Sequence, residues 1–143
     1  MLFLLLRIGD EGYAVAASRI VEILPLVEIK RMRATPPEVA GSFRYRGAFV
    51  PAIDLDRLEL GRPAPVRMGT RILVVDVPGN SRSSARERIG LIAAGATETL
   101  RYEASAFTPF ASGPHGLVQR LDIDKLLSPQ LRELLFARGE EAA

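Results

Sequence analysis

The sequence predicts an all-β fold, a barrel or a sandwich, followed by one C-terminal helix. About eight or nine short β-prone segments occur along the chain, separated by turn signals about every 8 to 12 residues. Only the last part of the chain places apolar residues at helical spacing. This pattern disfavours an alternating βαβ sheet, in which a helix would follow nearly every strand.

The first segments predict a hairpin and two further strands. The apolar run 2–8, the glycine-containing turn 9–12 and the apolar segment 13–16 are typical of a β-hairpin. Residues 20–24 are largely β-branched, and Pro25 ends the strand because it has no amide hydrogen to donate. Apolar and charged residues alternate imperfectly over 26–32, which predicts a strand with one solvated face.

The central stretch Gly41–Leu55 predicts a turn that leads into a buried strand. Arg44 and Arg46 are two residues apart, so an extended backbone places both on one side. Phe43 and Tyr45 then lie on the opposite side and anchor the segment. The apolar run 49–53 is expected to be core.

The second half of the chain predicts the remaining elements. Asp54 is expected to cap a short helical segment, 55–60, closed by Gly61. Three strands are predicted at 70–77, 89–94 and 97–102. Residues 107–116 are expected to be a loop, 116–122 the last strand, and 123–138 an amphipathic helix interrupted at Ser128-Pro129.

Composition and motifs exclude most catalytic classes. The 143 residues include no cysteine and one histidine, so thiol chemistry is absent and imidazole-rich metal sites are disfavoured. Asp54 and Asp56 do not by themselves make a general acid and base, and His115 has no second ligand to share a metal. We therefore predict no enzyme, no cofactor and no metal.

The apolar N-terminus predicts neither a signal peptide nor a membrane span. It meets Arg7 and lacks a basic start and a small-residue cleavage site. We expect a cytoplasmic protein with no direct membrane insertion.

Basic residues gather in one window that predicts a contact with a partner. The net charge is only +2, so local clustering matters more than the total charge. Arg46 lies between Tyr45 and Gly47, and arginine beside aromatic residues is enriched at protein interfaces. An alternative is a small basic β-barrel that binds single-stranded nucleic acid. The window contains Lys30, Arg31, Arg33, Arg44 and Arg46.

Four blocks in order along the chain resemble the CheW family, the adaptor domains of bacterial chemosensory arrays. They are Ile8–Val15, Ile20–Pro25, Pro36 to Leu55, and Gly116 to Asp122. The resemblance implies two interlocked five-stranded SH3-like barrels within residues 1–138, with 139–143 as a frayed tail. It also implies a non-enzymatic adaptor that joins the tips of methyl-accepting chemoreceptors to the regulatory domain of a histidine kinase, at membrane-associated receptor arrays.

The resemblance also implies which residues contact the receptor. Arg46 and Gly47 match the family's Asn-hydrophobic-Arg-Gly motif, and Ile20 and Glu22 match a second segment tied to receptor coupling. No nucleic-acid partner is implied.

Some details resemble the Wsp-type couplers of surface-sensing systems, whose output is a diguanylate cyclase. They are Leu24–Leu26, Phe43–Gly47, Leu58–Pro63 and Thr97–Leu100.

The chain departs from the family pattern at two places. Arg44 stands where the family motif has asparagine, which predicts a change in local turn geometry. The passage 102–116 is shorter than usual, which predicts a less complete second barrel.

Overall fold

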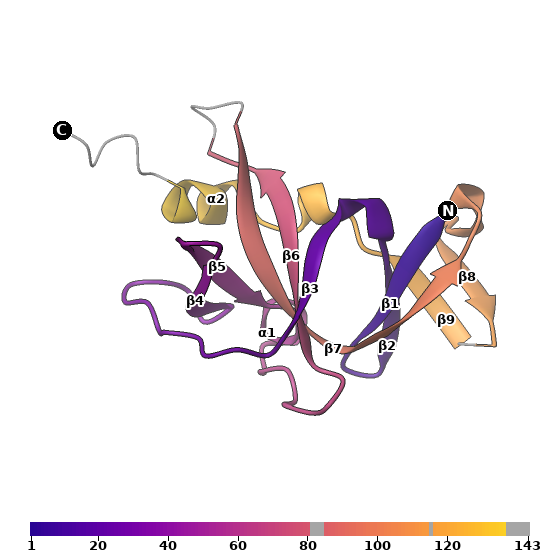
Figure 1. Cartoon of the computed structure of the whole chain (residues 1–143). Coiled ribbons are helices and arrows are strands. Elements are labelled where there is room, and N and C mark those ends of the chain that lie inside the picture. The colour runs from indigo at the N-terminus through magenta and orange to yellow at the C-terminus, as the bar shows by residue number, and fades with distance from the viewer. Residues whose placement is uncertain (81–84, 115, 137–143) are drawn as a thin grey trace.

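The computed structural model describes residues 1–80, 85–114 and 116–136, and most of these residues lie in β-strands (Figure 1). His115 and the predicted frayed tail, 139–143, lie outside the described residues. The strands in the described part are β1 (Leu2–Ile8), β2 (Glu11–Ala16), β3 (Ile20–Pro25), β4 (Val39–Tyr45), β5 (Ala48–Asp54), β6 (Arg71–Pro78), β7 (Arg86–Arg101), β8 (Phe110–Gly113) and β9 (Gly116–Arg120). The helices are α1 (Leu55–Leu60) and α2 (Pro129–Leu135), with 3-10 turns η1 (Ala17–Arg19), η2 (Ala104–Ala106) and η3 (Ile123–Lys125).

The strands form two five-stranded units that share β7. In the first unit, the N-terminal half of β7 pairs with β6 and β5, β6 pairs with β3, and β5 pairs with β4. In the second unit, the C-terminal half of β7 pairs with β1, and the order continues through β2 and β9 to β8. Figure 1 shows β7 running through both units. The predicted all-β fold with a short C-terminal helix is confirmed.

Strand β7 is one continuous element, so the prediction of two separate strands at 89–94 and 97–102 was wrong. Its pairing changes from β6, up to Ala93, to β1, from Ala94 onward. Gly95, at the change, has a φ of 62°, a left-handed value that glycine adopts without steric cost. The glycine therefore bends the strand between two sets of partners and does not end it.

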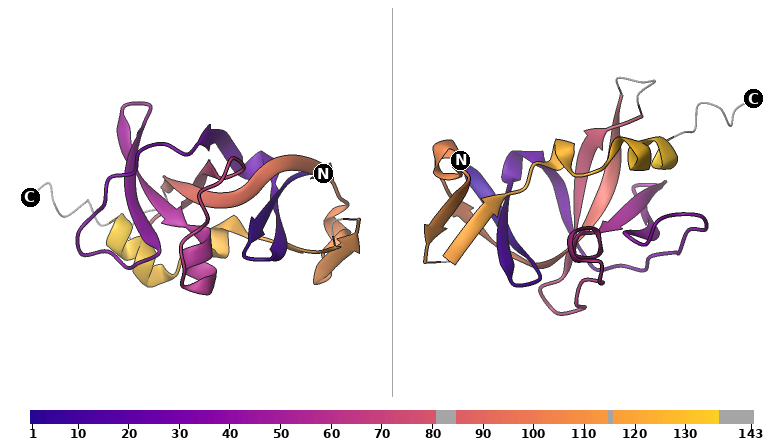
Figure 2. Two further views of the ribbon diagram at one scale, coloured as in Figure 1. Left: turned by 90° about the horizontal axis from the view of Figure 1, so that it is seen from below. Right: turned by 180° about the vertical axis from the view of Figure 1, so that it is seen from behind.

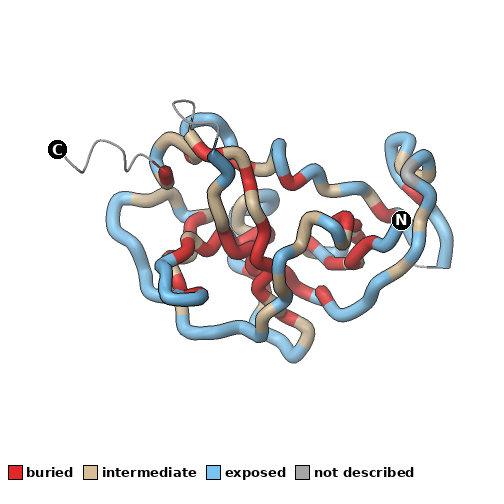
Figure 3. Tube along the Cα trace, turned by 45° about the horizontal axis from the view of Figure 1, so that its top comes forward, coloured by how far each residue is buried: buried red, intermediate tan, exposed pale blue. Residues whose placement is uncertain are grey.

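Two further predictions of local structure were wrong. Residues 26–32 form only an isolated bridge, between Lys30 and Ser42 of β4, because β3 ends at Pro25 and this pairing with β4 does not extend into a ladder. The expected loop 107–116 contains β8, because pairing with β9 outweighs its weak strand propensity. Figure 3 shows the exposed positions that follow β3, in contrast to the buried positions along the strands.

The larger hydrophobic core joins the first unit to the C-terminal segment. Ile123, Leu127, Leu131 and Phe136 pack with buried residues of β1, β6 and β7. Figure 2 shows this segment crossing from β9 back to the first unit, where α2 lies. Helix α2 begins at Pro129, where the sequence predicted the interruption, and Ser128 caps it by accepting a hydrogen bond from the Leu131 amide at 3.1 Å. None of the described helices has the length and hydropathy needed to cross a bilayer.

The second unit is open on one side. Within the described residues β8 pairs only with β9, and no ladder closes it onto β7, in agreement with the shortened passage 102–116. Aromatic rings fill the connection: the Phe3 ring centroid lies 6.0 Å from that of Tyr102 and 5.1 Å from that of Phe107. Edge contacts of this kind add stability beyond that gained from burying the area of the rings.

Asp54 and Asp56 both have structural roles. Asp54 caps α1 by accepting from the Arg57 amide at 3.1 Å, and it also accepts from the Ala64 amide. Asp56 is buried, and its Oδ2 accepts from the Gly9 amide at 3.2 Å. Its Oδ1 has no hydrogen-bond partner in the described part of the chain. Burial raises the pKa of Asp56, with Asp54 as a smaller contributor in the same direction.

The raised pKa makes Asp56 a source of pH-dependent stability. The native state binds the proton of the Asp56 carboxyl more tightly than the unfolded state does. The stability gained from this proton is complete below the ordinary pKa of 3.8, and it is lost as pH rises through the pKa of Asp56 in the native state. We expect Asp56→Asn to be at least as stable as the wild type at pH 7, and the difference to shrink at pH 3.5. Urea midpoints at both pH values measure it. The explanation would be wrong if the stability of Asp56→Asn relative to the wild type were lower at pH 7 than at pH 3.5.

Candidate partner-binding groove

The β4–β5 hairpin turns through two residues, Arg46 and Gly47. Their φ values are 49° and 80°, the positive values that the favoured two-residue hairpin turns require. Glycine adopts such a φ freely, whereas arginine does so at a cost. A Cβ added at Gly47 would meet no atom within 4 Å, so the turn stands free in solvent. The hairpin thus presents Arg46 at its tip.

The register of the hairpin decides which side chains face outward. Phe43 pairs with Val50 and both are buried, whereas Arg44 pairs with Phe49 and both are exposed. The predicted separation of arginines from Phe43 and Tyr45 is confirmed for Arg44. It was wrong for Arg46, which lies in the turn with its guanidinium carbon 5.1 Å from the Tyr45 ring centroid. The assignment of Phe49 to the core was wrong: its side chain is 67% exposed, because cross-strand partners share one face of a sheet.

A groove of about 580 Å³ lies between β3 and the tip of this hairpin, and we call it the β3–hairpin groove. Glu22 of β3 connects its two walls. One carboxylate oxygen, Oε1, accepts from the Tyr45 hydroxyl at 2.5 Å and from Nη2 of Arg46 at 3.2 Å. The hydrogen bond to Glu22, followed by burial, raises the pKa of Tyr45. The groove is lined by Glu22, Leu24, Val27, Glu28, Arg44, Tyr45 and Arg46.

An ionic network holds the hairpin from its other side. The guanidinium carbons of Arg46 and Arg88 lie 5.1 and 5.9 Å from the Tyr45 ring centroid, within range of a cation–π interaction. Arg88 pairs with Asp76 at 3.0 Å. Tyr45 therefore contacts both Glu22 of the groove and Arg88 of β7.

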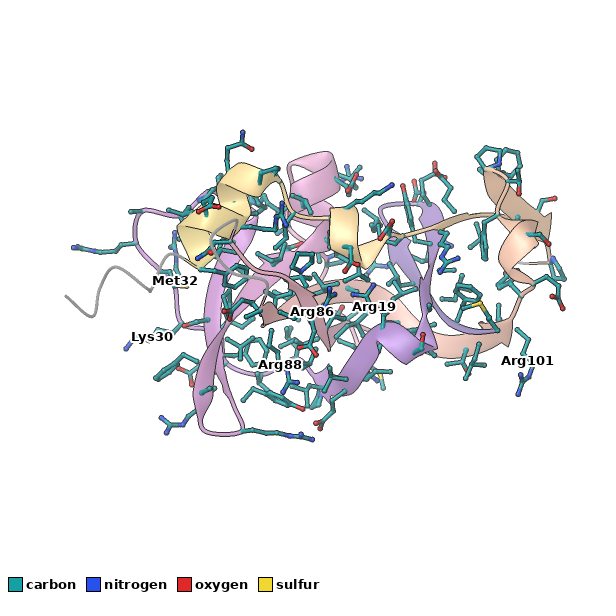
Figure 4. The ribbon with its side chains drawn as sticks, turned by 90° about the horizontal axis from the view of Figure 1, so that it is seen from above. Arg19, Lys30, Met32, Arg86, Arg88 and Arg101 are labelled. Atoms are coloured by element: carbon teal, nitrogen blue, oxygen red, sulfur yellow. The ribbon has the colours of Figure 1, made fainter. Side chains whose placement is uncertain are left out.

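The network continues to the C-terminal segment. Arg86 and Arg19 each donate to the backbone carbonyl of Asp76 and to Asp124 of η3, the latter at 2.7 Å. Hydrogen bonds from Arg86 and then Arg19 lower the pKa of Asp124. Figure 4 shows Arg19, Arg86 and Arg88 lying together, far from Arg101.

The structure brings together three of the four predicted receptor-contact residues. Glu22 and Arg46 form an ion pair, and Gly47 follows at the tip. Ile20 lies on the same strand as Glu22 but packs against the larger core, and it is not among the groove-lining residues.

Sequence reasoning missed several other residues that line the groove. Leu24 lies two residues from Glu22 on the same strand, so the strand period could have identified it. Val27 and Glu28 gave no local signal, because they reach the groove only through the path of the loop after Pro25.

The groove is suited to binding and not to catalysis. It offers two apolar side chains, two carboxylates and two guanidiniums, with no activated nucleophile. Over residues 1–80, 85–114 and 116–136, His, Asp and Glu side chains form no group of three or more that could hold a metal ion. A lining that combines apolar and charged side chains fits an amphipathic segment of another protein.

Comparisons with known proteins agree with this architecture. Chemotaxis protein CheW of Helicobacter pylori (strain ATCC 700392 / 26695) is 42% identical over 69 residues, which are 48% of this chain and 41% of that protein. The crystal structure of scaffolding protein TtCheW from Thermoanaerobacter tengcongensis has the same fold: its TM-score is 0.79 at 19% identity, with 94% of this chain and 92% of that chain covered.

The family comparison covers most of the sequence. The family described as the CheW-like domain matches residues 2–129. The predictions of a CheW-like protein and of a non-enzymatic adaptor class agree with this match. The chain therefore belongs to the family of CheW-like domain proteins.

Proposed function

We propose that this protein is an adaptor that couples methyl-accepting chemoreceptors to a histidine kinase in a bacterial chemosensory array. The observation that carries the proposal is the β3–hairpin groove, in which Glu22 and Arg46 form an exposed ion pair at the margin. The receptor's signalling tip is a helical coiled coil, and an amphipathic helix fits an apolar groove with charged margins.

Apolar contacts and charged groups contribute differently to binding in this groove. Leu24 and Val27 supply apolar surface between the strand and the loop. The side chains of Arg46 and Glu22 are 67% and 41% exposed, and exposed ion pairs contribute only about 0 to 1 kcal/mol each. Leu24 and Val27 therefore supply most of the affinity, while the charges fix register and exclude wrong partners.

A second partner has room at the opposite end of the molecule. Phe110 and Leu117 lie on the outward face of the β8–β9 hairpin and are 44% and 43% exposed. Figure 1 shows that hairpin and the β4–β5 hairpin at opposite ends. We assign the β8–β9 face to the regulatory domain of the kinase, so that the adaptor holds both partners at once. Receptor state then biases kinase geometry through differential binding, and the array adds avidity.

The finer assignment is a Wsp-type coupler whose system controls a diguanylate cyclase. Its support is the likeness of Leu24–Leu26, Phe43–Gly47, Leu58–Pro63 and Thr97–Leu100 to such couplers. Deletion of the gene is expected to change the cellular level of cyclic diguanylate on surface contact while leaving swimming bias unchanged. Loss of swimming chemotaxis with unchanged cyclic diguanylate would assign the protein to a motility system at the membrane-associated arrays.

Binding of the purified protein to soluble receptor signalling tips and to a kinase regulatory domain tests the proposal. We expect both to bind, separately and together. If neither binds, and single-stranded DNA or RNA binds with a steep salt dependence, the protein is a nucleic-acid module and not a coupler.

Replacing Leu117 by serine is expected to weaken kinase binding about tenfold or more, because it removes an apolar anchor from the proposed face. Binding of the receptor tip should be unchanged. Leu134→Ser is the matched control, since Leu134 is 51% exposed but lies on α2, away from the β8–β9 face. Isothermal titration measures both affinities. Equal effects of the two variants on kinase binding would remove the β8–β9 face from the proposal.

A further inference from the structure

Two arginines on the β4–β5 hairpin line the same groove, but their surroundings differ. Arg46 is paired with Glu22 at 3.2 Å. Arg44 forms no ion pair with any residue of the described part. Two carboxylates line the groove. Glu22 accepts from Arg46 and Tyr45, and Glu28 forms no bond with Arg44. Arg44 therefore has its N–H donors free at the groove margin.

Phe49 holds the Arg44 side chain in place. The two residues are directly paired across β4 and β5, and the guanidinium carbon lies 5.4 Å from the ring centroid. A guanidinium stacked on a ring keeps its planar edge of N–H groups available for other bonds. The stacking restricts the side chain before any partner arrives, so less rotamer entropy is lost on binding.

The surroundings of Arg44 favour an anionic partner. Lys30, on the preceding loop, is joined to β4 by backbone hydrogen bonds with Ser42 at 2.8 Å in both directions. Lys30 and its neighbours Arg31 and Arg33 are all exposed. Figure 4 shows Lys30 at the end of the molecule opposite Arg101. With Arg44 and Arg46, these basic residues outnumber Glu22 and Glu28, the two carboxylates that line the groove, and an excess of positive charge attracts a carboxylate.

We propose that Arg44 is a specificity-determining residue that binds an aspartate or glutamate of the receptor helix held in the β3–hairpin groove, with Phe49 as its positioning residue. This inference rests on the proposed function and makes it more specific. Arg44 selects helices that carry a carboxylate at the margin of the groove, through a bidentate bond that asparagine or lysine at this position does not form. Arg46, by contrast, is already partly neutralised by Glu22.

Titration of soluble receptor signalling-tip fragments into the wild type and Arg44→Asn tests the inference. Arg44→Asn is expected to weaken tip binding about tenfold, as loss of a hydrogen-bonded charge predicts. Arg44→Lys should restore only part of the affinity, because an ammonium group does not reproduce the fork of the guanidinium. Replacing the partner carboxylate by alanine should weaken tip binding by the wild type by the same factor. The same replacement should not weaken tip binding by Arg44→Asn any further. Phe49→Leu should weaken binding and Phe49→Tyr should preserve it.

Controls separate this inference from the proposed function. Arg67→Asn removes an exposed arginine that lies outside the groove and outside the basic window, and we expect it to bind tips nearly as the wild type does. Kinase-domain binding should be unchanged in every variant, which checks folding. If the wild type binds tips and Arg44→Asn binds them equally well, the inference is overturned and the proposed function stands. If the wild type binds no tip, both fail.

Discussion

Arg46→Glu is expected to weaken binding of the receptor tip by about 10- to 100-fold, with little loss of stability. The substitution removes the cation at the hairpin tip and places a second carboxylate beside Glu22, whose Oε1 lies 3.2 Å from Nη2 of Arg46. The groove margin then presents two adjacent negative charges to the incoming helix. Since the native pair is exposed, its loss should cost less than about 1 kcal/mol of folding free energy. Isothermal titration and thermal unfolding measure the two effects.

A charge exchange distinguishes recognition from local structure. The double variant Glu22→Arg with Arg46→Glu rebuilds an ion pair of opposite orientation across the groove. We expect it to be as stable as the wild type and still deficient in tip binding, because the partner meets the charges in the wrong places. Full recovery of binding in the double variant would show that the pair acts only by holding the hairpin, and wild-type affinity of Arg46→Glu would remove Arg46 from the site.

Gly90→Ala is expected to lower the free energy of unfolding by about 1 to 3 kcal/mol, the usual cost of overpacking a core. A Cβ at Gly90 would lie 2.7 Å from Cζ of Phe43 and 2.8 Å from Cγ2 of Ile72, both of which are buried. Gly90 is paired with Ala52 on one side and Val74 on the other, so the backbone has little freedom to move away. Urea unfolding measures the loss.

Gly113→Ala is the matched control for Gly90→Ala, because a Cβ at Gly113 would meet no atom within 4 Å. A second change in the Gly90→Ala background, Phe43→Leu, should recover part of the lost stability by making room for the methyl group. Phe43 lies on β4, so crowding at Gly90 should also displace the hairpin and weaken tip binding. A Gly90→Ala variant with wild-type stability would contradict the packing described here.

Local sequence signals were sufficient for much of the fold. Asp54 was identified as a cap because it lies directly before a helical segment whose first amides need acceptors, and Pro129 was identified as the first residue of a new helical segment. The outward Arg44 and the inward Phe43 and Tyr45 on β4 followed from the two-residue period of a strand. Resemblance to a family, and not any local pattern, singled out Glu22 and Arg46 together.

Errors occurred where distant neighbours decide the outcome. Phe49 is apolar and strand-forming, but its exposure depends on the register with Arg44. Residues 26–32 alternate as a strand does, but their pairing with β4 is limited to the bridge between Lys30 and Ser42. Gly95 resembles a strand break, but the change of partner from β6 to β1 carries the strand through it.

The sequence by itself determined the strand-rich fold, the Asp54 cap, the faces of Phe43, Arg44 and Tyr45 on β4, and the absence of cysteine chemistry. Only the tertiary structure decided that Glu22 meets Arg46, that the loop after Pro25 brings Val27 and Glu28 into the groove, and that Arg44 keeps its donors free. The physical reason is range. Caps and strand faces depend on residues a few positions apart, whereas the groove depends on pairings between strands that are distant in the chain, and many registers satisfy the same local pattern until the core selects one.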